Sequence, residues 1–283
     1  MVESKWEVGL LAVSVLIGGM QADAQTITGA NRPAVAAPAG MPDLMPGYLS
    51  KGAMPDSRRV LPPAPTRKSA TQARDVASAA MARKLKGSRR WVLARQDADL
   101  SFPHAADDFS CALGVKVSER TTPHLYTLLR RTLTDAGLST YPTKIQYKRP
   151  RPFTVTGGAI CTPEQADILR KDGSYPSGHS AIGWAWALIL AEAAPDHEDA
   201  ILARGRAFME SRVVCNVHWL SDTEAGAMMG SAVAARLHDQ AEFRADLEAA
   251  RTEIANARTA GAKPTRNCAA EAAALASAPL RLP

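Results

Sequence analysis

SAIGWAWALILAEAA, residues 180–194, is the stretch that decides the fold. Almost every residue in it is apolar, so a helix built from it has no face suited to water. The run is too short to cross a bilayer, which takes about 20 apolar residues. Pro195 follows it directly and ends it. We therefore expect a helix that is buried on every side, with the rest of the domain packed around it.

Helical patterns surround this central segment. Apolar residues at helical spacing, with Pro and Gly near the ends, predict helices over residues 71–97, 123–137, 162–173, 196–211 and 241–260. Ser221-Asp222-Thr223-Glu224 is typical of a capping box and predicts one more helix, from Asp222 to about residue 238. Strand-like alternation and hairpin turns between β-branched runs are absent from the sequence. The predicted fold class is all-α, a compact multi-helix bundle around residues 180–194 with no substantial sheet.

The amino terminus has the pattern of an export signal. Residues 8–20, VGLLAVSVLIGGM, form an apolar stretch too short for a membrane span, and Ala-Asp-Ala at 22–24 resembles a cleavage site. We interpret residues 1–24 as a secretory signal peptide and expect a periplasmic protein that begins at Gln25. Acidic residues near the start offset the positive charge of this region. A buried helix or an uncleaved anchor therefore remains an alternative interpretation of residues 1–24.

The remaining chain divides by composition. Residues 25–69 are rich in Pro and Ala and predict an extended arm, and residues 70–260 carry the helical domain. Residues 261–283 form an Ala/Pro-rich tail whose structure the sequence specifies weakly. After signal cleavage we expect no stable membrane span.

The charge balance favours a small anionic ligand. The net charge is +6, and the only dense basic cluster lies at residues 144–151. Aromatic residues make up only 5% of the chain, which disfavours a surface that stacks nucleic-acid bases, so we expect no nucleic-acid partner. The sequence leaves the oligomeric state open, including a homo-oligomer.

Four cysteines permit two disulfides in an oxidising compartment, in any of three pairings. We favour Cys161 with Cys215, because each lies close in sequence to a segment of the candidate site. That choice leaves Cys111 with Cys268, which would fix the carboxyl-terminal tail. No Cys/His cluster has the spacing of a zinc site, so we expect no metal.

Two segments supply cations and helix-start donors. Residues 144–152, KIQYKRPRP, contain Lys144 and Arg151, and Arg212 lies further along the chain. Arginine can hold two phosphate oxygens at once and lysine adds a compact charge. Pro176-Ser177-Gly178-His179 leads into the central helix, where free N–H groups favour an anion. Gly178 allows close approach, the Ser177 hydroxyl can donate, and His179 would protonate a leaving group.

His218 and Asp222 complete the candidate site. A carboxylate on one imidazole nitrogen fixes the tautomer and leaves the other nitrogen as a nucleophile. Taken singly, a Ser-Gly-His turn, a basic run and a His–Asp pair usually have only structural roles. The other four histidines lack such surroundings and carry no functional prediction: His104, His124, His197 and His238.

Taken together, these segments resemble a known family. Lys144-x6-Arg151-Pro152, Pro176-Ser177-Gly178-His179 and Ser211-Arg212-x5-His218-x3-Asp222 match the signature of the type-2 phosphatidic acid phosphatase superfamily. The flanking sequences, KDGSYPSGHS and SRVVCNVHW, resemble its soluble branch, the class A bacterial non-specific acid phosphatases. The resemblance extends over about residues 70–260. Ser180 stands where the family often has Thr.

The resemblance implies a secreted, metal-independent acid phosphatase that hydrolyses phosphate monoesters broadly through a phosphohistidine. It implies no cofactor, although phosphate or vanadate can occupy the site. His218 would be the nucleophile, Asp222 its partner and His179 the general acid. The implied phosphate ligands are Lys144, Arg151, Ser177, Gly178 and Arg212.

Other functions remain as alternatives. Transfer of the phosphoryl group to alcohols would use the same intermediate. A vanadium-dependent haloperoxidase would use the same anion pocket, although such enzymes are generally longer. A lipid phosphate phosphatase would need membrane helices, and a phosphate-storage protein would need no nucleophile and acid pair.

Overall fold

The computed structural model describes residues 44–276. The predicted signal peptide, residues 25–43 of the predicted arm and residues 277–283 of the tail lie outside the described residues. Within the described part every regular element is a helix, as the all-α prediction requires. None of these helices has the length and apolarity that a membrane crossing demands.

The helices follow one another in a simple order. They are α1 (Ser57–Val60), α2 (Ala70–Arg83), α3 (Arg89–Gln96), η1 (Ala105–Asp107), α4 (Ser110–Leu113), α5 (Pro123–Ser139), α6 (Tyr141–Tyr147), α7 (Pro152–Val155), η2 (Pro163–Gln165), α8 (Ala166–Lys171), α9 (Gly178–Ala193), η3 (Pro195–His197), α10 (Glu198–Val214), α11 (Leu220–Leu237), α12 (Ala241–Thr259) and α13 (Cys268–Ala276). The η elements are short 3₁₀ helices.

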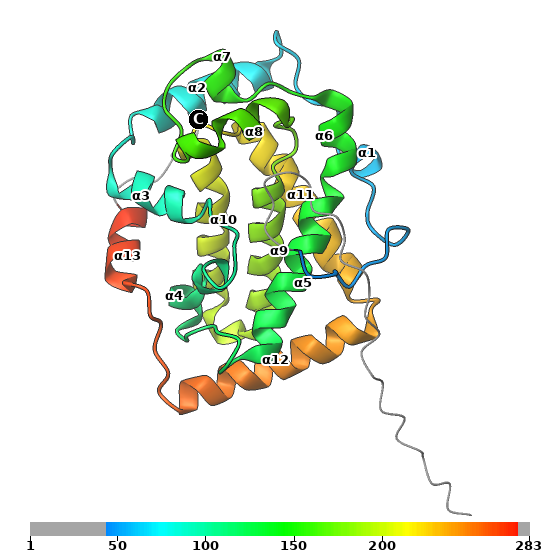
Figure 1. The fold of residues 1–283 in the computed structure, drawn as a ribbon, viewed down its shortest axis with the longest axis vertical. Coiled ribbons are helices and arrows are strands. Elements are labelled where there is room, and N and C mark those ends of the chain that lie inside the picture. The colour runs from blue at the N-terminus through cyan, green and yellow to red at the C-terminus, as the bar shows by residue number, and fades with distance from the viewer. Residues whose placement is uncertain (1–43, 277–283) are drawn as a thin grey trace, which may run out of the picture. The chain divides into compact units, whose positions relative to one another are not determined.

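Helix α9 is the buried centre that its composition predicts. It packs against α5, α10 and α11, and α12 crosses the lower ends of these helices in Figure 1. Trp186 on α9 is fully buried, and its indole N–H donates to the carbonyl oxygen of Leu129 on α5 at 3.0 Å. Phe109 and Phe208 pack their rings against the same indole. Burial of these large aromatic side chains holds the bundle around α9.

Two details differ from the sequence prediction. The helix expected over residues 71–97 is broken into α2 and α3, because Gly87 lies between them with φ of 77°, a conformation that glycine adopts readily. Helix α11 begins at Leu220 with Trp219 as its N-cap, so Asp222 is the third helical residue and not the first. Its carboxylate accepts the N–H of Trp219 at 2.8 Å.

Residues flanking the predicted helical domain also belong to the packed structure. Leu44, Tyr48 and Leu61 lie in the main apolar core. The Asp135 carboxylate on α5 accepts the backbone N–H groups of Tyr48 and Leu49 at 2.8 and 3.1 Å. These contacts attach the described part of the predicted arm to the centre of the bundle.

The carboxyl-terminal tail forms a further helix. A disulfide between Cys111 and Cys268 joins the start of α13 to α4. Arg266, just before α13, forms an ion pair with the buried Asp108 at 2.6 Å. The bond and the ion pair together position a segment that composition alone specifies weakly.

Close packing between α9 and α11 depends on two glycines. A Cβ atom at Gly226 would lie 2.5 Å from the carbonyl oxygen of Ser177, and one at Gly230 would lie 2.5 Å from that of Ala181. Such separations are well inside van der Waals contact, so only glycine lets the two backbones approach this closely. Because Ser177 precedes α9 directly, this packing also fixes the start of the central helix.

We predict that Gly230→Ala lowers the free energy of unfolding by about 1–3 kcal/mol, because the methyl group overpacks a rigid contact between two backbones. Urea unfolding followed by circular dichroism measures the change. Gly52→Ala is the control, since no atom lies within 4 Å of its Cβ position. Equal unfolding free energies for the two variants would contradict the close-packing account.

Candidate active site

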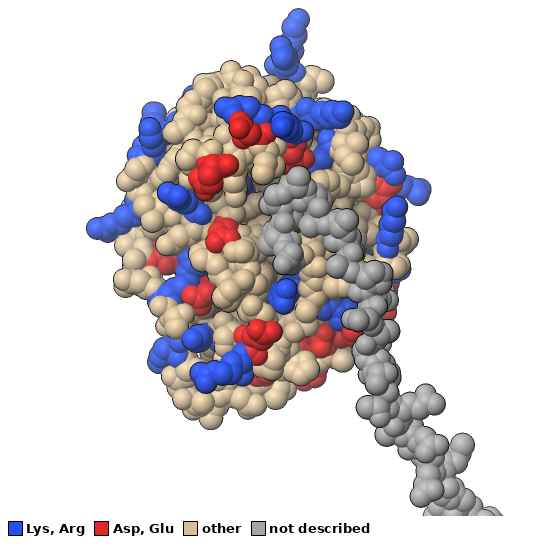
Figure 2. All heavy atoms as spheres, in the orientation of Figure 1, with Lys and Arg blue, Asp and Glu red and all other residues tan. Residues whose placement is uncertain are grey.

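The predicted site residues meet at one cavity. It has a volume of about 840 Å³ and is lined by side chains from segments far apart in the sequence. Among its lining residues are Lys144, Arg151, Gly178, His179, Arg212 and His218. Ser177 and Asp222 are fully buried beside these residues and do not line it. The face shown in Figure 2 intersperses basic with acidic residues, so the surplus positive charge does not form one continuous patch there.

Lys144, on α6, is buried at the cavity wall. Its Nζ donates to the carbonyl oxygen of Gly173 at 2.7 Å and lies 3.4 Å from Asp172 Oδ2. Burial lowers the pKa of its ammonium group to about 8, and Arg151 contributes to the same shift. A second negative charge beside the ammonium group would favour its charged form.

Arg151 is held in place by the protein on several sides. Its backbone is extended, as expected for a residue before proline. Nη1 donates to the carbonyl oxygen of Val217 at 2.8 Å and lies 3.0 Å from His218 Nε2. Nη2 donates to Asp172 Oδ2 at 3.0 Å. The guanidinium group therefore lies directly beside the imidazole expected to act as nucleophile.

Arg212, in the last turn of α10, is the clearest sign of an anion site. Its side chain is buried, yet Nε and Nη1 have no hydrogen-bond partner among the described residues. Burial, and then the charge of Arg151, lower the pKa of the guanidinium group to about 9. A buried donor without an acceptor is costly, and a bound oxyanion would supply acceptors to this one.

Ser177 and Gly178 form the start of α9. Ser177 is the N-cap, and its Oγ accepts the N–H of Ser180 at 3.2 Å and the Ser180 hydroxyl at 2.9 Å. Its own hydroxyl proton remains available as a donor. The N–H groups of the first turn have no intrahelical acceptor, and the helix dipole favours an anion beside them.

His218 lies in the loop between α10 and α11, and its imidazole is buried. Nδ1 is 3.4 Å from Asp222 Oδ2, and Nε2 is the nitrogen that faces Arg151. Burial lowers the pKa of His218 well below its usual value, and the neighbouring cations Arg151 and Lys144 lower it further. This shift favours the neutral form of the ring.

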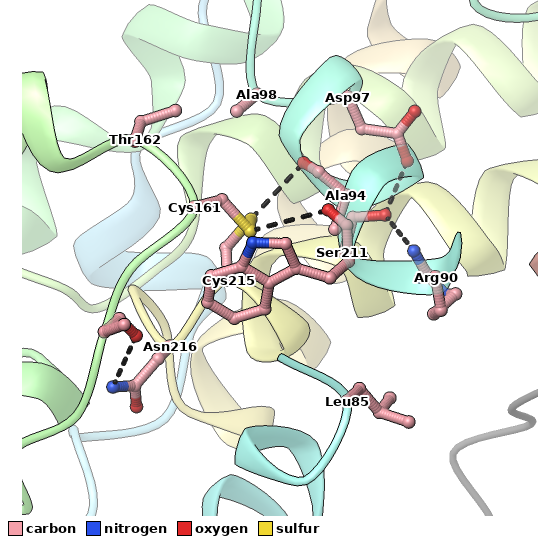
Figure 3. The surroundings of a disulfide bond; sticks show 12 residues. Leu85, Arg90, Ala94, Asp97, Ala98, Cys161, Thr162, Ser211, Cys215 and Asn216 are labelled. Atoms are coloured by element: carbon pink, nitrogen blue, oxygen red, sulfur yellow. Dashed lines mark hydrogen bonds between the residues drawn. A yellow bond between two sulfur atoms is a disulfide. The ribbon is translucent and has the colours of Figure 1, made fainter. Parts of the chain in front are cut away.

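The shape of this loop follows from two local features. Asn216 adopts a left-handed conformation with φ of 60°, which asparagine tolerates better than most residues, and its side chain donates to the carbonyl oxygen of Gly157 at 2.9 Å. Cys215, next to it, forms a disulfide with Cys161 (Figure 3). Both cysteine pairs favoured from the sequence are thus present, and this one holds the His218 loop.

His179 is in the first turn of α9. Its Nε2 donates to the carbonyl oxygen of Ala98 at 3.1 Å, which leaves Nδ1 for another partner. Burial and the charge of Arg212 lower the pKa of His179 well below its usual value. A bound anion would oppose this shift and favour the protonated ring.

Comparison with known proteins agrees with this geometry. Residues 123–245 match the PAP2 superfamily. The chain is 46% identical over 204 residues to an acid phosphatase of Zymomonas mobilis, a match that covers 72% of this chain and 77% of that protein. It is 41% identical over 215 residues to a non-specific acid phosphatase of Providencia stuartii, covering 76% and 86%, and 41% identical over 171 residues to one of Salmonella typhimurium, covering 60% and 68%.

The chain belongs to the class A non-specific acid phosphatases of the PAP2 superfamily. This membership confirms the family predicted from the three segments, and it makes the protein a phosphatase.

Sequence reasoning missed the residue that supports Asp222 in this phosphatase. Arg149 is buried and bridges two fully buried carboxylates, with Nη1 donating to Asp222 Oδ1 at 2.5 Å and Nη2 to Asp75 Oδ2 at 2.7 Å. Asp75, on α2, also accepts the N–H and the hydroxyl of Ser221 at 2.8 and 2.6 Å. The basic cluster at 144–151 contains Arg149, but nothing in the sequence pattern distinguishes it or connects it with Asp75.

Several residues that were not predicted also line the cavity, Asp172 and His104 among them. Asp172, which follows α8, contacts both Lys144 and Arg151. His104 also lines the cavity, although the sequence gave no reason to place it there. Among residues 44–276, no three His, Cys, Asp or Glu side chains are grouped as metal ligands would be.

We predict that Arg149→Met lowers kcat at least tenfold and moves the acid limb of the pH–rate profile to higher pH. Burial raises the pKa of the Asp222 carboxyl and Arg149 opposes that rise, so loss of the guanidinium group favours a protonated, neutral Asp222. Besides Arg149, the titratable groups near Asp222 include His218, Lys144, Arg151 and Tyr175, and Asp75 shares the Arg149 guanidinium group.

The measurement is kcat against pH for Arg149→Met, with Arg149→Lys and the exposed Arg236→Met for comparison. The lysine variant keeps a positive charge and should retain the wild-type acid limb. Unchanged profiles in all three variants would show that Asp222 does not depend on Arg149.

Proposed function

We propose that this acid phosphatase hydrolyses phosphate monoesters through a covalent phosphohistidine on Nε2 of His218. The observation that carries the proposal is the pair of buried Arg212 nitrogens, Nε and Nη1, that have no hydrogen-bond partner among residues 44–276. Arg212 and His218 line the same cavity. An oxyanion that accepted hydrogen bonds from these Arg212 nitrogens would lie among Lys144, Arg151 and the start of α9. Phosphoryl transfer requires mainly this kind of charge stabilisation and alignment.

In the first step, the Nε2 lone pair of His218 attacks phosphorus and the bond from phosphorus to the ester oxygen breaks. The leaving oxygen takes a proton from His179 and departs as the alcohol. The imidazole becomes positively charged on phosphorylation, and the Asp222 carboxylate beside Nδ1 stabilises that charge.

In the second step, water attacks the phosphohistidine and returns the enzyme. His179, now neutral, accepts a proton from the water, and Nε2 of His218 leaves phosphorus with its bonding pair. An alcohol in place of water would receive the phosphoryl group instead, so the same intermediate supports phosphotransfer. The cavity of about 840 Å³ leaves room for an alcohol group beyond the phosphate.

The pH dependence follows from the two imidazoles. Both have pKa values well below the usual one in this structure, chiefly because of burial. His218 therefore stays neutral as the pH falls, while His179 gains its proton only at low pH or beside a bound phosphate. Turnover that needs both states is favoured at acidic pH and is lost as the pH rises.

Fixed cations supply the charge that a metal supplies in other phosphatases. Lys144, Arg151 and Arg212 together present three positive charges at the cavity. We propose on this ground that the reaction is metal-independent. The relatives named as acid phosphatases favour phosphate-ester hydrolysis over the alternative function, that of a vanadium-dependent haloperoxidase, which would use the same anion pocket.

The test of the mechanism uses two histidine variants and two classes of leaving group. We predict that His218→Ala abolishes turnover of every ester. His179→Ala should lower kcat at least 100-fold for an alkyl phosphate but much less for p-nitrophenyl phosphate, whose leaving group needs no proton, in keeping with the usual size of general acid catalysis.

The matched control is His124→Ala, because His124 is exposed on α5 and does not line the cavity. Each assay is repeated with a chelator, which should leave the rates unchanged. If His179→Ala lowered kcat equally for the two classes of leaving group, His179 would not be the general acid. Loss of activity with chelator would contradict the metal-free mechanism.

We also propose that the enzyme acts in the periplasm. The signal-like sequence at residues 1–24 and the two disulfides support export to an oxidising compartment. We predict that the enzyme recovered from the periplasmic fraction begins at Gln25, as mass spectrometry of the intact protein would measure. A periplasmic fraction without the enzyme, or a chain that keeps residues 1–24, would refute this.

A further inference from the structure

One carboxylate contacts two of the proposed phosphate-binding cations. Oδ2 of Asp172 lies 3.0 Å from Nη2 of Arg151 and 3.4 Å from Nζ of Lys144. Asp172 lines the same cavity as these two residues. A carboxylate oxygen in this position resembles a phosphate oxygen in both charge and hydrogen-bonding capacity.

The other donors of Arg151 are already used by the protein. Nε donates to the carbonyl oxygens of Leu169 and Asp172, and Nη1 donates to that of Val217. Nη2, by contrast, has Asp172 as its short-range acceptor, with the carbonyl oxygen of Gly173 more distant at 3.5 Å. A phosphate oxygen that accepted the N–H of Nη2 now donated to Asp172 would therefore compete with the Asp172 carboxylate.

The Asp172 side chain is partly exposed, whereas the backbone after it is closely packed. About one third of the side chain is exposed, so the carboxylate has a path to solvent. At Gly173 a Cβ atom would lie 2.7 Å from the carbonyl oxygen of Lys144, and the Gly173 carbonyl oxygen accepts a hydrogen bond from Lys144 Nζ. Displacement of the carboxylate would thus occur by rotation of the side chain alone.

We propose that Asp172 is a specificity-determining residue that competes with phosphate for Lys144 and Arg151 and so limits the affinity of the site for free phosphate. Should the carboxylate stay in place, it repels the bound anion. Should it rotate away, its ion pairs are lost when phosphate binds. Both routes weaken binding of the product, whose release frees the enzyme for another turnover. This proposal rests on the assignment of Lys144 and Arg151 as phosphate ligands.

Asp172→Asn tests the negative charge of the Asp172 side chain separately from its shape. The amide has the same shape as the carboxylate and keeps an oxygen that can accept from Arg151, but it carries no negative charge. Asp167→Asn is the control, since Asp167 lies on α8, the helix that Asp172 follows, is exposed and pairs with Arg170 away from the cavity. Asp172→Ser removes the charge with a smaller side chain and serves as a second test.

The experiment measures binding of inorganic phosphate by calorimetry and its competitive inhibition of p-nitrophenyl phosphate hydrolysis, at one pH and one ionic strength. We expect Asp172→Asn to lower both Kd and Ki about tenfold, which corresponds to about 1.4 kcal/mol. Asp172→Ser should change both constants in the same direction, and Asp167→Asn should match the wild type.

Unchanged or weaker phosphate binding in both Asp172 variants, with melting temperatures near that of the wild type, would overturn the proposal and assign Asp172 to orienting the cations. Binding needs no turnover, so it separates this proposal from the mechanism above. A wild-type protein that binds phosphate but hydrolyses no ester would contradict the mechanism, while the order of the phosphate affinities would still decide the role of Asp172.

Discussion

Crowding of buried positive charge is the constraint on which the site depends. Lys144, Arg151 and Arg212 are all taken out of water at one cavity, and burial lowers the pKa of each. Such a group of like charges is unfavourable without anions nearby. The helices around α9 must therefore be stable enough to hold these cations close together, and the Trp186 cluster and the glycine contacts of α11 provide that rigidity.

Two carboxylates offset this positive charge, Asp222 and Asp172. Asp222 is fully buried behind His218 and is fixed by Arg149 and the N–H of Trp219. Asp172 lies at the cavity, where solvent reaches part of its side chain. The buried carboxylate is suited to stabilising charge on the imidazole, whereas the accessible one can yield its place to a substrate. This difference in burial is the physical basis of the two roles that we propose for them.

The central helix and the cavity residues could be predicted because local patterns encode them. An unbroken apolar run specifies a buried helix, and Pro-Ser-Gly-His specifies its start. Asp75 could not be found in this way, because its partner Arg149 is far away in the sequence and only the tertiary structure brings the segment between α6 and α7 next to α2. Helical periodicity does not predict the break at Gly87 either, because a single glycine leaves the composition of the residues around it unchanged.

The two disulfides have a practical consequence for handling the enzyme. Cys161–Cys215 restrains the loop that carries His218, and Cys111–Cys268 joins segments that both lie outside residues 123–245. A fragment limited to residues 123–245 would lack the Cys111–Cys268 disulfide and the Asp75 carboxylate. It would also lack the neighbours of Cys215 on α3. Recombinant production in a reducing cytosol would likewise yield molecules in which the His218 loop is less firmly held, so low specific activity there would reflect missing disulfides and not a poor catalyst.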